Sequence, residues 1–73
     1  MSTLQAALRA GTARLQEAGI PDAPRDARLL LAHALGLAPD RLSLHLPDLL
    51  LPEAATRYDA ALTARAARHP VSH

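Results

Sequence analysis

An amphipathic helix is clearest in the stretch Asp26-Ala27-Arg28-Leu29-Leu30-Leu31-Ala32-His33-Ala34-Leu35-Gly36. Its apolar residues recur at i, i+3, i+4, i+7 and i+8, the spacing of a helix that faces a core: Ala27, Leu30, Leu31, Ala34 and Leu35. Gly36 predicts the end of this helix, which we expect to begin at about Ala23. Leu29 lies off the stripe, one turn from His33. We therefore expect the helix to contact neighbours on two sides, with His33 half-buried.

A first helix is predicted N-terminal to this one, from about Thr3 to Ala18. Its apolar stripe has helical spacing and consists of Leu4, Leu8, Gly11, Leu15 and Ala18. Ser2 with Gln5 has the spacing of a capping box, and Gly19 predicts a left-handed helix end. Asp22 is placed to cap the second helix by accepting hydrogen bonds from its first turn.

A short helix is predicted after Pro39, with a stripe of Leu42, Leu46, Leu49 and Leu50. Pro47 limits it to about two turns, and the segment 47–51 is either loop or a fifth helical turn. The alternation Leu42-x-Leu44-x-Leu46 also fits an edge strand, although the sequence contains no second strand to pair with it.

The last helix is predicted from Pro52 to about Arg68, with Pro70 ending it. Its stripe is Ala55, Tyr58, Leu62 and Ala66, and Glu53 with Arg57 forms a favourable i, i+4 pair. The fold class is therefore all-α: a small bundle of four to five helices with short loops.

Length and composition restrict the chain to one domain of modest stability. It has 73 residues, no cysteine and a net charge of +1 at pH 7. A chain of this length buries only about 60% of the surface that it exposes when unfolded. The absence of cysteine excludes disulfides and thiolate metal sites, and no apolar run approaches the roughly 20 residues of a membrane span. We expect a cytoplasmic protein without a membrane partner.

Several sequence patterns contain residue types that are typical of metal sites or catalytic sites. His69 and His73 have metal-ligand spacing, but Pro70 breaks the helix between them. Asp40, Ser43 and His45 include the residue types of a catalytic triad, but Ser43 and His45 are two residues apart on a short helix and so point in different directions. Glycine-rich phosphate loops are absent. The sequence thus indicates no catalytic, cofactor-binding or metal-binding residue.

The segment 30–45 has the outline of a helix-turn-helix, which leaves an independent DNA-binding or regulatory module as the alternative function. Its second helix carries few polar side chains and places Asp40 where phosphate would lie. Binding to nucleic acid needs several aligned cations, so this partner is not favoured.

The stretch Asp26 to Leu37 resembles the N-terminal helical domain of the HemK family, which are glutamine N5-methyltransferases of peptide chain release factors. The order of parts is also similar, from a helix of the type "A-L-x-x-x-x-x-L" at Ala7 to Leu15, to a closing segment of the type "R-R-x-x-x-x-P-[VI]-x-[HY]". Here that closing segment is Arg65-Ala66-Ala67-Arg68-His69-Pro70-Val71-Ser72-His73. The resemblance covers essentially the whole chain.

The resemblance implies that residues 1–73 are a single N-terminal domain of a longer methyltransferase whose C-terminal Rossmann-like catalytic domain is absent here. The family transfers a methyl group from S-adenosylmethionine to the glutamine of the release factor's Gly-Gly-Gln loop. The cofactor motif and the Asn-Pro-Pro-Tyr motif of that domain do not occur in this sequence. The implied role is therefore non-catalytic docking of the release factor, with no cofactor bound by this domain.

Arginine side chains are the candidate partner-binding residues of such a domain. Their planar guanidinium groups offer paired donors to carboxylates on a protein surface. Those on or beside the first two helices are Arg9, Arg14, Arg25 and Arg28. The alternative is that these four side chains are simply solvated surface charges.

Overall fold

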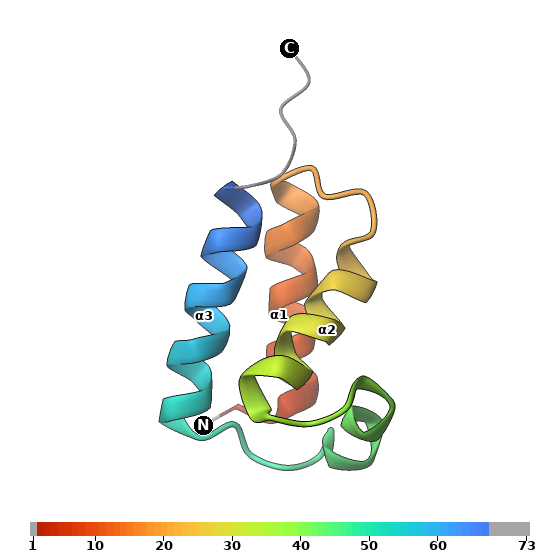
Figure 1. Cartoon of the computed structure of the whole chain (residues 1–73), viewed down its shortest axis with the longest axis vertical. Helices are drawn as coiled ribbons and strands as arrows, with labels where there is room; N and C mark the ends of the chain where they lie inside the picture. Colours follow the sequence, from red (N-terminus) through yellow and green to blue (C-terminus); the bar gives the residue numbers. More distant parts are fainter. Residues whose placement is uncertain (1, 68–73) are drawn as a thin grey trace.

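The computed structural model describes residues 2–67, in which four helical elements follow one another along the chain. They are α1 (Leu4–Glu17), α2 (Ala23–Leu35), the 3-10 helix η1 (Pro39–His45) and α3 (Pro52–Ala67). The three α-helices form a bundle, and η1 lies at the end where α2 finishes (Figure 1). The predicted all-α class is confirmed.

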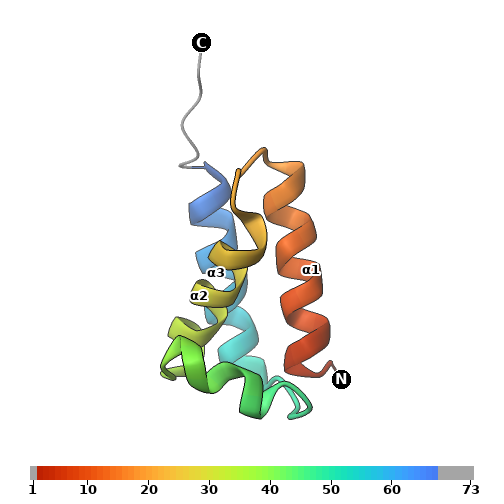
Figure 2. The ribbon, with the colours of Figure 1, turned by 90° about the vertical axis from the view of Figure 1, so that its right-hand side faces the viewer.

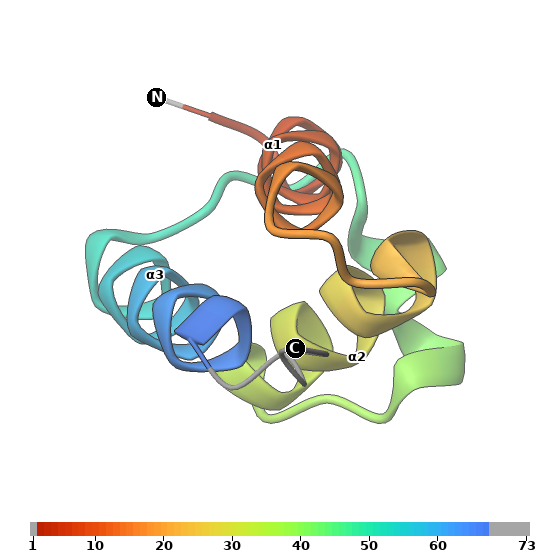
Figure 3. The ribbon, with the colours of Figure 1, turned by 90° about the horizontal axis from the view of Figure 1, so that it is seen from above.

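Helix α2 is the central element, as its apolar pattern predicted. It packs against α1, α3 and η1, and the view along the bundle shows the three α-helices arranged around one interior (Figure 3). The fully buried leucines come from three different elements, Leu15 of α1, Leu31 of α2 and Leu42 of η1. The core is therefore built where these elements meet.

The buried face of α2 is rotated slightly from the predicted stripe. Ala27, Leu31 and Ala34 are buried as expected, but Leu30 and Leu35 are only partly buried. Ala32 is 0% exposed although the stripe omitted it.

The prediction for the other flank of α2 was wrong. Leu29 is 40% exposed and His33 is exposed. Both residues lie across the helix from Leu31, whereas α1, α3 and η1 gather around the Leu31 side. The contacts of α2 on two sides therefore do not involve this pair.

The start of α1 differs from the predicted capping box. Thr3 is the N-cap, and its hydroxyl oxygen accepts a hydrogen bond of 3.2 Å from the backbone N–H of Ala6. Ser2 instead belongs to a short extended pairing, in which its carbonyl accepts from the N–H of Leu50 at 2.8 Å. Because that pairing fixes Ser2 outside the helix, the cap moves one residue along the chain.

The loops around α2 follow the glycine signals but not the aspartate signal. Gly19 and Gly36 have φ angles of 83° and 72°, so both adopt the predicted left-handed conformation at a helix end. Asp22 is the N-cap of α2, yet its side chain makes no capping hydrogen bond. Its backbone carbonyl accepts from the N–H of Asp26 at 2.9 Å instead.

The segment 46–51 does not form a fifth helix. The edge strand considered for residues 42–46 is also not formed, because Pro39–His45 is the 3-10 helix η1. Leu49 pairs with Thr3 in an isolated antiparallel bridge, and the N–H of Leu4 donates to the carbonyl of Asp48 at 2.8 Å. The connection between η1 and α3 is therefore attached to the beginning of α1 (Figure 2). Leu49 is 54% exposed, so its predicted place in the core stripe was wrong.

Helix α3 buries Tyr58 and Leu62 as predicted, but Ala54 takes the buried position expected for Ala55. The predicted Glu53–Arg57 pair is not among the ion pairs of residues 2–67, because Arg57 Nε donates to the carbonyl oxygen of Ala34 at 3.2 Å. The predictions for Arg68 and Pro70 lie outside the described residues. None of the helices within residues 2–67 is both long and apolar enough to cross a membrane.

Tyr58 joins all three α-helices. It belongs to α3, its hydroxyl donates to the carbonyl of Ala27 in α2 at 3.2 Å, and its ring lies directly against Gly11 of α1. Burial raises the pKa of the Tyr58 hydroxyl to about 12 from the ordinary 10.0, and the Arg14 guanidinium opposes this shift. The fold therefore favours the protonated phenol.

This shift predicts that stability falls in alkaline solution. The contribution of the neutral phenol is complete below pH 10, the pKa in the unfolded chain, and is lost as the pH rises through about 12. Between pH 9 and 11 we expect the free energy of unfolding to fall by about 1 kcal/mol, measured by urea denaturation. The chain has one tyrosine, no cysteine and no lysine, so few other groups titrate there. Tyr58→Phe should remove the pH dependence, and its persistence in that variant would contradict the assignment.

Candidate functional site

Arg14 is the one candidate arginine that the fold ties to another helix. Its Nη1 lies 2.6 Å from Asp59 Oδ1, and its Nη2 donates to Thr63 Oγ1 at 2.9 Å. Both partners are on α3, one turn apart. The guanidinium therefore bridges α1 and α3, and a partner that bound it would have to share or replace these contacts.

The other three candidates remain at the surface of α1 and α2. Arg25 Nη1 is 3.9 Å from Asp22 Oδ2, and both side chains are mostly exposed, so this pair contributes little to stability. Arg9 and Arg28 are exposed, and neither is in an ion pair within residues 2–67. Arg9 borders a shallow hollow beside Thr3, Gln5 and Ala6. The structure thus places the four candidates in different surroundings rather than in one cluster.

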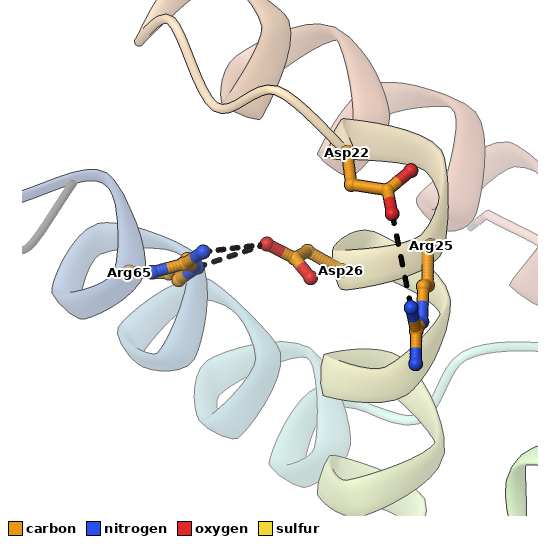
Figure 4. Close-up of polar contacts among 4 residues, drawn as sticks. All are labelled: Asp22, Arg25, Asp26 and Arg65. Carbon is orange, nitrogen blue, oxygen red and sulfur yellow. Dashed lines mark hydrogen bonds and ion pairs between the residues drawn. The ribbon is translucent and has the colours of Figure 1, made fainter. Parts of the chain in front are cut away.

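An ion pair that was not predicted from the sequence joins α2 to α3. Arg65 Nε and Nη2 both donate to Asp26 Oδ2, at 3.0 and 2.8 Å, and Figure 4 shows the two side chains reaching across between the helices. Asp26 lies in the first turn of α2 and Arg65 in the last turn of α3, and each charge suits the dipole of its own helix. An acidic residue at the start of one predicted helix and a basic residue at the end of another could have indicated that these two helices pack antiparallel.

A groove of about 330 Å³ runs between α1 and α3. Its floor is formed largely by small residues, among them Ala6, Ala10 and Gly11, and the Arg14–Asp59 ion pair lies along its edge. Such a surface can pack against an apolar side chain and offer it a charged border.

The residue patterns that resemble a catalytic triad or a metal site do not come together as such sites within residues 2–67. His45 Nδ1 lies 2.9 Å from Asp48 Oδ2, while Ser43 is exposed and is not its partner. Within residues 2–67, no three histidine, cysteine, aspartate or glutamate side chains come together as metal ligands. His69 and His73 lie outside the described residues.

The helix-turn-helix alternative is not favoured by the shape of its second element. Residues Pro39–His45 form a 3-10 helix of 7 residues, and its Leu42 is fully buried in the core. A recognition helix must present one polar face to base edges in the major groove. This short element is turned toward α2 instead.

The fold and its surface define a small all-α domain with a groove between two of its helices and an ion pair beside that groove. Residues 6–73 match the PrmC N-terminal domain family, and the chain belongs to this family.

The curated relatives that it matches are each named release factor glutamine methyltransferase. The protein of Cereibacter sphaeroides is 66% identical over 65 residues, which are 89% of this chain and 23% of the relative. Those of Corynebacterium glutamicum and Mycolicibacterium smegmatis are each 41% identical over 73 residues, 100% of this chain and 25% of the relative. The chain therefore spans about a quarter of the length of these relatives. No solved structure matches it significantly.

Proposed function

We propose that this domain docks the release factor for a cytoplasmic methyltransferase that modifies the glutamine of the Gly-Gly-Gln loop. The relatives' name, release factor glutamine methyltransferase, supports the reaction and the class of substrate, and the resemblance to the HemK family supports the Gly-Gly-Gln target. In this proposal, S-adenosylmethionine binds to a C-terminal catalytic domain of the same protein. The present domain contacts that domain and the release factor, and carries out no chemistry itself.

The observation that carries the proposal is the lining of the groove between α1 and α3, in a chain that belongs to this family. The groove between α1 and α3 has an apolar floor and an ion pair along its edge, a combination suited to side chains of a protein. The buried polar side-chain atoms of residues 2–67 all have hydrogen-bond partners.

Docking at a distance from the reacting amide assists catalysis by orientation. Contacts to remote parts of a substrate supply binding energy that holds the reacting group in a productive position. A small rigid bundle serves this purpose because its surface is ordered before the partner arrives, which reduces the entropy lost on binding.

We expect the chain to bind a release factor and not to bind S-adenosylmethionine. The measurement is a nuclear magnetic resonance titration of the isotopically labelled chain, with calorimetry to obtain the dissociation constants. Shifted resonances should cluster on one face of the bundle with release factor, and should stay unchanged with the cofactor. Titration with duplex DNA at low salt is the control for the alternative module, and a steep salt-dependent affinity would favour it. Clear binding of S-adenosylmethionine would contradict the proposed division of labour.

A further inference from the structure

Another concave surface lies at the end of the bundle near η1. This end hollow has a volume of about 180 Å³ and is lined mainly by leucines, among them Leu35, Leu37, Leu49 and Leu51. Leu49 and Leu51 are 54% and 65% exposed, and the neighbouring Leu44 is 72% exposed. Three of the four large exposed hydrophobic residues in the described chain therefore lie within 44–51. Such a concentration of exposed leucine marks an interaction site more often than scattered single leucines do.

The backbone under the end hollow is held in place. Hydrogen bonds of 2.8 Å join the N–H of Leu4 to the carbonyl of Asp48, and the N–H of Leu50 to the carbonyl of Ser2. They attach the segment that carries Leu49 and Leu51 to the beginning of α1. The exposed leucines are thus presented on a fixed backbone, which lowers the entropic cost of binding.

The size of the end hollow and the charge of its border limit what can occupy it. Its volume is below the roughly 300–1,000 Å³ of small-molecule sites, so it suits side chains better than a cofactor. Asp48 lies on its border, paired with His45, and the exposed Glu53 follows in the first turn of α3. No arginine of residues 2–67 lines it. An aliphatic side chain flanked by basic residues would match this surface in shape and charge.

The end hollow also lies away from the C-terminal end of α3. In Figures 1 and 2, η1 and the connection to α3 are at one end of the bundle, and the last turn of α3 is at the other. Helix α3 has 16 residues, so these ends are about 24 Å apart. The end hollow is therefore a different surface from the end of the bundle where α3 finishes.

We propose that the end hollow receives an aliphatic side chain of the release factor, flanked there by lysine or arginine residues. The inference rests on the proposed function and adds a docking surface to the groove between α1 and α3. It assigns the apolar anchor of docking to Leu49 and Leu51, and not to the arginines of α1 and α2. The Asp48 carboxylate at the border then helps to orient the partner and speeds its association.

The test is the affinity of the chain for release factor, measured by calorimetry, in a variant that carries both Leu49→Ser and Leu51→Ser. Both side chains are more than half exposed, so the fold should survive, and circular dichroism with urea denaturation checks this. We expect the dissociation constant to rise at least about tenfold, as for other central apolar contacts. The single variant Leu51→Ser should show an intermediate rise and serves if the double variant loses its fold. The matched control is Leu29→Ser on the outer side of α2, which should change the constant less than about twofold.

Other results would overturn the assignment in distinguishable ways. Unchanged affinity of the folded double variant would leave the proposed function intact and reject the end hollow. Self-association of the chain that the double variant abolishes, with release factor binding retained, would identify a second copy as the occupant. The same two substitutions could instead loosen the contact between the domains of the whole enzyme, so that a protease separates them more readily while release factor binding is retained. That result would identify the catalytic domain as the occupant of the end hollow. A wild-type chain that does not bind release factor would reject both proposals.

Discussion

Replacement of Leu31 by alanine is expected to lower the free energy of unfolding by about 2 to 5 kcal/mol. Leu31 is 0% exposed and belongs to the cluster in which residues of α1, α2, η1 and α3 meet. Truncation there loses apolar burial and leaves a cavity that helices on several sides prevent from closing. A domain of this length has a total stability of only about 4 to 11 kcal/mol, so Leu31→Ala should bring it close to unfolding. Urea denaturation followed by circular dichroism measures the loss.

Leu30→Ala and Leu29→Ala are the matched controls, because the three leucines are consecutive in one helix. Leu30 is partly buried and Leu29 is 40% exposed. We expect losses of about 1 kcal/mol at Leu30 and less than about 0.5 kcal/mol at Leu29. The apolar stripe in the sequence placed Leu30 and Leu31 equally in the core. Equal losses of stability at these two positions would therefore contradict the difference in burial that the structure shows.

The comparison at α2 shows what helical periodicity can and cannot determine. The period identified the helix and its general apolar side, because these depend only on local spacing. The exact centre of the buried face depends on where neighbouring helices lie. Ala32 is buried and Leu35 only partly so because α1, α3 and η1 contact α2 from particular directions.

The ends of the elements show the same limit. Ser2 and Asp22 have side chains that suit a helix cap, yet the cap of α1 is Thr3 and the Asp22 side chain makes no cap bond. The position of Ser2 is decided by its hydrogen bond to Leu50, which is far away in the sequence. Local capping signals cannot include a contact of this kind.

Residue type alone nominated the four arginines as candidates for partner contacts, and it could not predict how the fold arranges them. The engagement of Arg14 with α3 depends on how two helices pack. Leu49 was predicted as core because it fitted a helical period through 42–50. The bridge to Thr3 replaced that helix with extended backbone, which left Leu49 at the surface beside Leu51.

Gly11→Ala is expected to destabilise the domain by about 2 kcal/mol, although alanine ordinarily stabilises a helix interior relative to glycine by about 1 kcal/mol. A Cβ atom at this position would overlap the Tyr58 hydroxyl oxygen and come within 2.8 Å of Cζ. Tyr58 is 3% exposed and its hydroxyl donates to the carbonyl of Ala27, so the ring cannot move without losing that bond. The steric cost and the lost bond together exceed the gain in helix propensity. Urea denaturation again provides the measurement.

Two comparisons separate this contact from a general effect of substitution in α1. Ala13→Gly, at an exposed position of the same helix, should cost about 1 kcal/mol through propensity alone. In a Tyr58→Phe background the hydroxyl overlap is gone while the approach to Cζ remains, so the cost of Gly11→Ala should fall by about 1 kcal/mol. That coupling arises only if α1 and α3 approach each other at Gly11 as closely as the structure shows. A stabilising Gly11→Ala would mean that the ring of Tyr58 lies elsewhere, and the floor of the groove between α1 and α3 would then have a different shape.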